Sequence, residues 1–143
     1  MIRSYRNTDQ KAVMNIWLQS NLKAHSFIAA DYWQTHYEEV AKMLSSAELL
    51  VAESEGRICG FIGMYKEMIA GLFVEEHCRS KGIGKMLLDT AKQMNDQLYL
   101  QVYKKNKRAL HFYLRESFSF EKEQQDAASG EIEYVMKWVK KKL

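Results

Sequence analysis

The chain has 143 residues, 47% of them hydrophobic, which is enough for one compact domain with a sizeable core. Its formal net charge of +3 is a weak bias for a nucleic-acid-binding protein, and no apolar run of about eighteen residues indicates a membrane span. Residues 1–6 lack the apolar stretch of a signal peptide. We therefore expect one cytoplasmic domain over residues 1–143, with no nucleic-acid and no membrane partner.

The chain has two cysteines, Cys59 and Cys78. Their spacing matches neither metal-binding nor redox-active cysteine motifs, and Cys59 lies in an apolar run typical of a buried strand. We expect both to be free thiols with structural roles, and we expect no metal site.

The N-terminal part of the chain predicts one short strand and two helices. A strand over residues 1–6 precedes Thr8, which we expect to cap the first helix. Apolar residues then recur at helical spacing toward Ala24, and again after a break at residues 25–28. The two stripes are Val13, Ile16, Trp17 and Ser20, and then Trp33, Tyr37, Val40, Ala41 and Leu44. Together they predict a helical hairpin.

The middle of the chain predicts three strands. Apolar runs cover residues 48–53, 58–65 and 69–74, and the Glu55-Gly56 turn signal joins the first two. Such runs, separated only by short turns, are typical of neighbouring antiparallel strands. We therefore expect a three-stranded meander.

The C-terminal part predicts two helices and further strands. A helical stripe begins at Gly82, an alternating strand follows over residues 98–102, and residues 106–116 predict another helix. The last strand is expected to pair with Phe118 and Phe120. Its face comprises Ile132, Tyr134, Met136 and Trp138, and the stripe after Gly82 comprises Ile83, Met86, Leu87, Ala91 and Met94. The expected fold class is α+β, built around a mixed sheet.

A basic, glycine-containing turn joins the third strand of the meander to the next helix. It reads Arg79-Ser80-Lys81-Gly82-Ile83-Gly84. The first N–H groups of a helix have no intrahelical acceptor, and glycine lets a ligand approach the backbone closely, so the turn is suited to binding phosphate. A Walker A loop would need glycine at position 79 and Ser or Thr at 86, where Arg79 and Met86 stand. A dinucleotide fingerprint would need a small residue at position 87, where Leu87 stands.

This turn, preceded by the apolar strand Ala70-Gly71-Leu72-Phe73-Val74, resembles the Arg-x-x-Gly-x-Gly signature of the GNAT acetyltransferase superfamily. The stretch from Val102 through Asn106 to Phe112-Tyr113 resembles the second signature of the same family, in the same order along the chain. The likeness extends over essentially the whole chain. One departure is Val74-Glu75-Glu76, where the family often has Val-x-Pro.

The resemblance implies the GNAT fold, a mixed, mostly antiparallel twisted sheet of about seven strands flanked by about four helices. It also implies acetyl-coenzyme A as the cosubstrate. The residues that it assigns to coenzyme binding are Leu72, Phe73, Val74, Arg79, Ser80, Lys81, Gly82, Ile83, Gly84, Lys85, Asn106 and Tyr113.

Within this set the resemblance implies distinct roles. Asn106 and Tyr113 are seven residues apart, so they share one face of a helix. By resemblance that face meets the coenzyme, and Tyr113 is the candidate general acid for the departing thiolate. Backbone groups of residues 72–74 would pair with the pantetheine amides, and an N–H of Leu72 or Phe73 would stabilise the oxyanion. Tyr113 is also compatible with a purely structural role as a core aromatic.

The acceptor side is less defined. The loop between the first two helices overhangs the thioester in the family, which makes His25, Phe27, Ile28 and Tyr32 candidates for the acceptor pocket. Glu67 and His25 are weak candidates for a general base, because Glu67 equally fits a solvent-exposed turn and His25 a helix C-terminal cation. We assign neither as the base.

Three classes of function remain to be separated. The leading one is an N-acetyltransferase whose acceptor is a protein lysine, an N-terminal amine or a small-molecule amine. The alternative is a non-catalytic acyl-coenzyme A binding module. Nucleic-acid binding through the basic clusters at residues 79–85 and 104–108 is disfavoured, because coenzyme phosphates account for the same charges. Both a monomer and a homodimer stay open.

Overall fold

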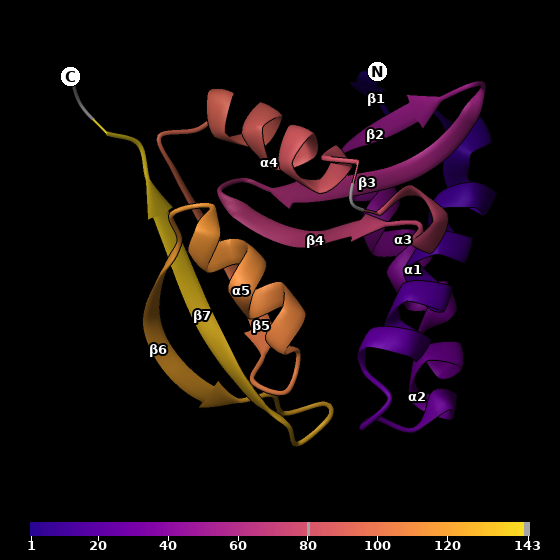
Figure 1. Ribbon diagram of the computed structural model, residues 1–143. Helices are drawn as coiled ribbons and strands as arrows, with labels where there is room; N and C mark the ends of the chain where they lie inside the picture. Colours follow the sequence, from indigo (N-terminus) through magenta and orange to yellow (C-terminus); the bar gives the residue numbers. More distant parts are fainter. Residues whose placement is uncertain (80, 142–143) are drawn as a thin grey trace.

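A computed structural model describes residues 1–79 and 81–141 (Figure 1). Within these residues the chain forms a seven-stranded sheet of order β1-β2-β3-β4-β5-β7-β6. All neighbouring strands are antiparallel except β4 and β5, which are parallel. The elements in chain order are β1 (Ile2–Ser4), α1 (Gln10–Ala24), α2 (Ala30–Thr35), α3 (Tyr37–Ser46), β2 (Glu48–Ser54), β3 (Arg57–Tyr65), β4 (Met68–Val74), α4 (Ile83–Gln93), β5 (Gln97–Tyr103), α5 (Lys107–Arg115), β6 (Ser119–Gln125) and β7 (Ile132–Val139), with 3-10 turns at Asn7–Asp9 and Glu76–Cys78.

The strands β2 and β3 are buried on both faces, because helices cover both sides of the sheet there. Successive side chains of a strand point to opposite faces, and β2 and β3 follow this alternation. One face packs against α1, α2 and α3 through Leu49, Val51 and Phe61. The other face packs against α4 through Leu50 and Ile62. Figure 1 shows α4 and the group α1–α3 on either side of β3 and β4.

The C-terminal half of the sheet packs against α5. Leu110 and Tyr113 of this helix share a buried cluster with Leu100 of β5 and Met136 of β7. The strand β7 lies between β5 and β6 and pairs with both along most of its length. The helix α5 is therefore fixed on the half of the sheet that α1–α3 do not cover, as Figure 1 shows.

The two halves of the sheet meet at β4 and β5 and then separate. The parallel pairing comprises only Met68 with Tyr99 and Ile69 with Leu100. The register between β3 and β4 shifts next to this point, leaving Ala70 as an extra residue in β4, and such a bulge bends a strand. Beyond Ile69 the edge of β4 that faces β5 is therefore left open, which positions the site described below.

The α+β class and the mixed, mostly antiparallel sheet are confirmed. The described residues contain five α-helices rather than about four, because the second helix expected from sequence is divided. It is interrupted at His36, which separates α2 from α3. The apolar stripe continues across this interruption, so periodicity alone did not reveal it.

Other local expectations need correction. Thr8 does not cap α1; the preceding residues form a 3-10 turn, and the Asp9 carboxylate accepts the backbone N–H of Arg6 at 2.8 Å. The sequence predicts Met86 and Met94 on the buried face of one helix, yet they are 43% and 48% exposed, and Met94 lies directly after the end of α4. Helix α4 buries a narrower stripe than its apolar residues suggest. None of the helices in residues 1–79 and 81–141 is long and apolar enough to cross a membrane.

Both cysteines are buried and unpaired, as expected. Burial, followed by the neighbouring Cys78, raises the pKa of the Cys59 thiol to about 11. A thiol with such a pKa stays protonated and unreactive near neutral pH. Over the described part of the chain no group of three or more His, Cys, Asp or Glu converges as a metal site would require.

Candidate active site

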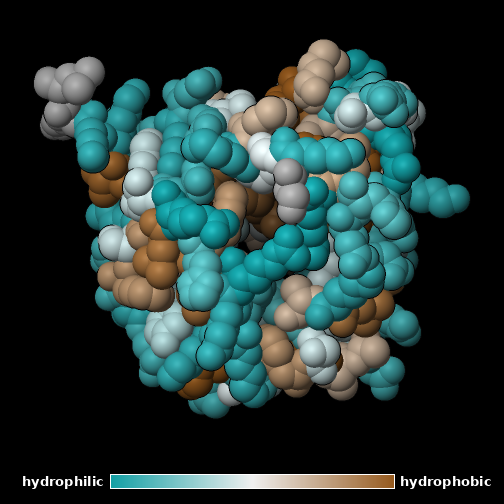
Figure 2. Space-filling view, viewed as in Figure 1, coloured by the Kyte–Doolittle hydropathy of each residue, from teal (hydrophilic) through white to brown (hydrophobic). Residues whose placement is uncertain are grey.

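A cleft of about 700 Å³ opens where β4 and β5 separate. Its walls are the end of β4, the start of α4, the first two turns of α5 and the C-terminal turn of α1. Figure 2 shows a hollow in this face of the molecule, apolar in its depth and hydrophilic around its rim. The cleft thus brings together residues that are far apart in the sequence.

Most of the residues assigned to coenzyme binding line this cleft, and they come from three separate segments. They are Leu72, Phe73, Val74, Arg79, Gly82, Ile83, Gly84, Lys85, Asn106 and Tyr113. Lys81 is exposed and does not line it, and Ser80 lies outside the described residues. Among the acceptor-side candidates, His25 lines the cleft.

The start of α4 lines the cleft with Gly82, Ile83, Gly84 and Lys85. Gly82 precedes the helix with φ of +78°, a left-handed conformation that glycine adopts without steric cost. This conformation redirects the chain from the basic turn into the helix. Gly84 lies in the first turn and lines the cleft without a side chain to cover the backbone. A helix start of this kind favours an anionic group.

Cationic side chains gather around the same end of the cleft. Burial lowers the pKa of Arg79, and the nearby positive charge of Arg108 lowers it further. The Arg79 Nε donates a hydrogen bond to the carbonyl oxygen of Val74 at 3.4 Å, which holds the side chain against β4. Two guanidinium groups that repel one another in this way are stabilised by an anion between or beside them.

The open edge of β4 provides backbone groups rather than side chains. Phe73 is directed toward α1, where its ring lies 5.4 Å from that of Phe61. Leu72 and Val74 pack on the opposite face against the core under α4. Because side chains on both faces anchor this segment, its main chain is held at the cleft wall. An extended ligand with amide groups can pair with such an edge.

Tyr113 lies at the base of the cleft on α5 and is 8% exposed. Its ring packs between those of Phe112 and Phe118, with centroid distances of 5.2 and 5.5 Å. Burial raises the pKa of the Tyr113 hydroxyl well above its ordinary value. No described residue hydrogen-bonds to this hydroxyl, so the protonated group can donate a hydrogen bond to a ligand in the cleft.

His25 and Asn106 meet across the cleft. Asn106 caps α5, where its Oδ1 accepts the N–H of Ala109 at 3.3 Å, and its Nδ2 lies 3.0 Å from His25 Nε2. The other ring nitrogen, Nδ1, lies 2.8 Å from Oδ1 of Asn21. Burial lowers the pKa of His25 to about 4. The ring is neutral at physiological pH with both nitrogens engaged, which leaves it unsuited to act as a base.

The remaining acceptor-side candidates lie outside the cleft. Phe27 packs against the ring of Tyr103 at 5.7 Å, and Ile28 and Tyr32 pack against the cluster under α1. Glu67 lies at the β3–β4 turn, at the opposite end of β4 from the cleft, and its carboxylate accepts a hydrogen bond from Gln97.

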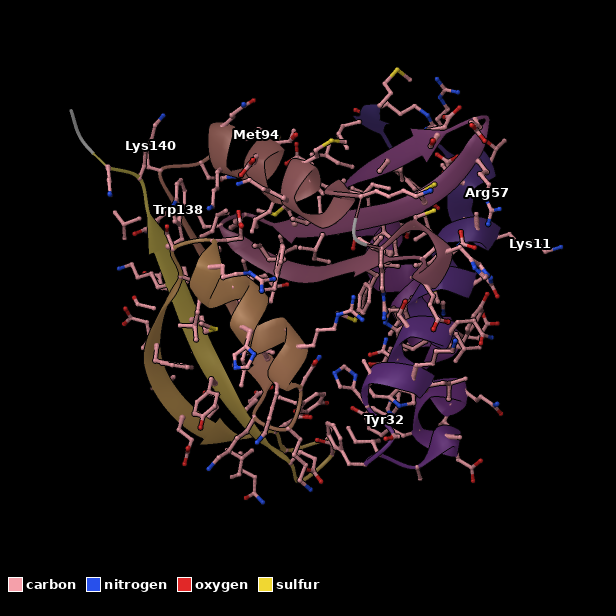
Figure 3. All side chains as sticks on the ribbon, viewed as in Figure 1. Lys11, Tyr32, Arg57, Met94, Trp138 and Lys140 are labelled. Atoms are coloured by element: carbon pink, nitrogen blue, oxygen red, sulfur yellow. The ribbon has the colours of Figure 1, made fainter. Side chains whose placement is uncertain are left out.

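A polar cluster lies between α2 and the β6–β7 hairpin, next to Tyr103. The Tyr103 hydroxyl donates to the Asp126 carboxylate at 3.1 Å. On β7, Glu133 is the cross-strand neighbour of Tyr103. Glu133 is 8% exposed and accepts one hydrogen bond, from Gln124. Figure 3 shows Tyr32 on α2 at the lower end of the molecule in this view. We refer to Tyr103, Asp126 and Glu133 as the acidic cluster.

Sequence reasoning did not single out several residues of the cleft. Arg108 and Lys107 belong to the basic cluster at residues 104–108 and were not assigned to coenzyme binding, although both line the cleft with Arg79. Asn21 was missed because a polar residue on a helix carries no special signal. Its position four residues before His25 was the one available clue, since residues at that spacing share a helix face.

Comparisons with known proteins agree with this geometry. The family model of the acetyltransferase (GNAT) domain matches residues 45–120. The chain is 33% identical over 120 residues to the peptidyl-lysine N-acetyltransferase YiaC of Escherichia coli (strain K12), with 82% of each chain covered. It is 29% identical over 118 residues to the peptidyl-lysine N-acetyltransferase YjaB of the same organism, covering 82% of this chain and 80% of YjaB.

A solved structure shows the same architecture. The solution structure of apo YjaB from Escherichia coli matches with a TM-score of 0.87 and 25% identity, covering 99% of this chain and 98% of that one. The family match spans more than half of the chain, and it includes β4, the basic turn and α5. The chain therefore belongs to the GNAT family of acetyltransferases.

Proposed function

We propose that residues 1–143 form one N-acetyltransferase domain that transfers the acetyl group of acetyl-coenzyme A to the side-chain amine of a protein lysine. The observation that supports it most is the composition of the cleft. One wall offers cations and a helix N-terminus, the next an open strand edge, and the base a buried, protonated phenol. The lysine acceptor is supported by the names of YiaC and YjaB.

The residues of the cleft fit coenzyme A part by part. Its phosphates match the first turn of α4, with Arg79 and Arg108 supplying charge-assisted hydrogen bonds. The pantetheine arm carries two amides, which match the backbone of Leu72 to Val74. Gly84 leaves the backbone of the first turn uncovered. This assignment uses the described residues and leaves Ser80 aside.

Acetyl-coenzyme A supplies an activated thioester, whose carbonyl carbon a neutral amine can attack. As the C–S bond breaks, Tyr113 would donate its hydroxyl proton to the sulfur, so that coenzyme A leaves as the thiol, whose reference pKa is about 8.5, and the Tyr113 phenolate would regain a proton from water. A backbone N–H of Leu72 or Phe73 would stabilise the negative charge on the carbonyl oxygen, an effect worth about 3 kcal/mol for one donor.

We propose that the proton of the attacking amine leaves through water rather than to a fixed side chain. His25 is neutral with both ring nitrogens engaged, and Glu67 lies at the far end of β4. The acidic cluster would attract a lysine ammonium to the acceptor side before its deprotonation. The carboxylates of Asp126 and Glu133 would attract an acceptor that arrives as a cation, as a lysine side chain does.

The proposal is tested by the release of free thiol from acetyl-coenzyme A in the presence of different amines. The panel comprises a lysine peptide with a blocked N-terminus, a lysine-free peptide with a free N-terminus, a polyamine and an aminoglycoside. Release that depends on the lysine peptide supports the proposal. Release only with another amine would reassign the acceptor, and coenzyme binding without release for any amine would favour a binding module.

A further inference from the structure

A chain of four hydrogen bonds runs from α1 to α5 at the cleft. Asn21 Nδ2 donates to the carbonyl oxygen of Trp17 at 2.8 Å, and Asn21 Oδ1 lies 2.8 Å from His25 Nδ1. His25 Nε2 lies 3.0 Å from Asn106 Nδ2, and Asn106 Oδ1 accepts the N–H of Ala109. We call these bonds the relay. They join residues 81 positions apart in the sequence.

One end of the relay is a backbone acceptor and the other a backbone donor. These two groups determine which atom donates and which accepts in every bond between them. A backbone carbonyl can only accept, which directs the Asn21 amide nitrogen to Trp17 and its oxygen to His25. A backbone N–H can only donate, which directs the Asn106 oxygen to Ala109 and its nitrogen to His25. His25 must therefore carry its proton on Nδ1 and accept at Nε2.

The surroundings of His25 hold the ring in this orientation. It is 8% exposed, stacks on Trp33 with a centroid distance of 5.5 Å, and meets the edge of Tyr103 at 4.9 Å. Aromatic neighbours on two sides prevent the ring from turning. The relay is consequently a rigid link, and bonds aligned in one direction polarise one another.

The relay determines what Asn106 offers to the cleft. One N–H of its amide is used by His25 and its oxygen by Ala109, so the second N–H is the group left for a ligand. Asn106 also fixes the start of α5, the helix that carries Tyr113. Without the link to His25 the Asn106 amide could turn, and its second N–H would no longer have a fixed direction.

We propose that His25 and Asn21 are positioning residues, which orient the Asn106 amide as a hydrogen-bond donor toward coenzyme A and hold α1 against the start of α5. The inference rests on the proposed function only in taking coenzyme A as the ligand of the cleft. It gives His25 a role in cofactor affinity rather than in proton abstraction.

The first test measures the affinity for coenzyme A by titration calorimetry at fixed salt. His25→Phe keeps an aromatic ring but removes both polar bonds, and we expect it to weaken binding about tenfold, as the loss of one bond to a ligand implies. His25→Gln places an oxygen near the position of Nε2 that can accept from Asn106, and we expect it to restore most of the affinity. Val51→Ala, buried under α1 and away from the cleft, serves as the control for lost stability.

Asn21→Ala tests whether the effect travels along the relay. We expect it to weaken coenzyme binding severalfold in the unaltered protein and to add nothing when combined with His25→Phe, because its effect passes through the ring. In the transfer reaction these variants should raise KM for acetyl-coenzyme A with a smaller change in kcat. Additive losses, or equal losses in His25→Phe, His25→Gln and Val51→Ala, would show a merely structural role and overturn the inference.

A spectroscopic readout tests the relay without any ligand. In ¹⁵N NMR spectra the His25 ring should show a protonated Nδ1 and an unprotonated Nε2, and Asn21→Ala should alter this pattern. An Nε2–H tautomer would overturn the inference. If the unaltered protein binds no coenzyme A, the proposed function fails together with this role; if it binds and His25→Phe binds equally well, this role alone fails.

Discussion

At the scale of single residues, the chemistry depends on burial more than on charge. Tyr113 shares the cleft with several cations, yet burial is what raises the pKa of its hydroxyl. A raised pKa favours the protonated form, so the group keeps its proton as the pH rises past the ordinary value of 10.0. His25 is shifted in the opposite sense, since burial disfavours its charged form. Each group is thereby held neutral.

Replacing Tyr113 by Phe removes the hydroxyl and keeps the ring in its aromatic cluster. We expect kcat for acetyl transfer to fall about a hundredfold, within the range for loss of a general acid, and the affinity for coenzyme A to stay nearly unchanged. Steady-state kinetics and calorimetric titration separate the two effects. A variant with full kcat would assign Tyr113 to the core alone.

Glu133 is the residue of the acidic cluster that we expect to act on the acceptor. Replacing it by Gln keeps the shape and the contact with Gln124 but removes the charge. We expect KM for a lysine peptide to rise about fivefold, as one charge interaction near a protein surface implies, with KM for acetyl-coenzyme A unchanged. An unchanged peptide KM would exclude this carboxylate from acceptor binding. Glu121→Gln, exposed on β6, is the matched control.

At the scale of elements, the site depends on how β4 lies between β3 and the open cleft. Gly60 of β3 pairs with Val74 at the end of β4. A Cβ atom built on Gly60 would lie 2.7 Å from the Phe73 carbonyl oxygen and 3.3 Å from the Val74 Cα. Both neighbours are backbone atoms, so the strands would have to move apart. The close approach of the two strands therefore requires glycine here.

Gly60→Ala consequently tests the position of β4. We expect a loss of about 2 kcal/mol in the free energy of unfolding and a raised KM for acetyl-coenzyme A. Gly56→Ala is the control: its strain lies in the β2–β3 turn, with φ of +77°, and should cost about 1 kcal/mol without changing KM. Denaturant unfolding and kinetics measure both quantities. Equal effects of the two variants on KM would argue against a role for this strand.

The start of α4 is the second element on which the site depends. Arg79→Gln removes one cation next to this helix start, and we expect affinity for coenzyme A to fall about tenfold at low salt. The loss should shrink as salt is added, because screening weakens the interaction in the unaltered protein. Lys122→Gln, exposed on β6, makes the same change in net charge and should have no effect. Equal affinities of Arg79→Gln and the unaltered protein would contradict phosphate binding here.

At the scale of the whole molecule, much of the fold could be predicted because its signals are local. A few consecutive residues were enough to predict each of the apolar strands β2, β3 and β4, and the glycine turn before α4. The break between α2 and α3 at His36 was not, since the apolar stripe passes through it. The relay was also hidden, because it joins Asn21 and Asn106 through a contact that only the folded chain creates.

An ion pair between β1 and the 3-10 turn before α1 contributes to the stability of the whole molecule. Arg3 donates to both oxygens of Asp9, at 2.8 and 3.0 Å, and these bonds are the main cause that lowers the pKa of Asp9 below 3.8. A lowered folded-state pKa contributes stability that is present above 3.8 and is lost as the pH falls through the folded-state value.

Asp9→Asn should therefore lower the free energy of unfolding by about 2 kcal/mol at neutral pH, as charged hydrogen bonds of this kind imply. The difference from the unaltered protein should narrow as the pH falls below 3.8. Thermal unfolding across pH measures it, with Asp89→Asn on α4 as the control that should change little, because the half-exposed Asp89 pairs, among the described residues, only with exposed Lys85. A difference that does not depend on pH would contradict the role of this ion pair.

Mass spectrometry of one reaction tests most directly whether the cleft transfers acetyl groups to lysine, as we propose. A peptide with one lysine and a blocked N-terminus is incubated with acetyl-coenzyme A and either the unaltered protein or Tyr113→Phe. We predict acetylation of the lysine side chain by the unaltered protein and much slower acetylation by the variant. A peptide left unmodified by a protein that binds the coenzyme, or acetylated equally fast by both proteins, would contradict it.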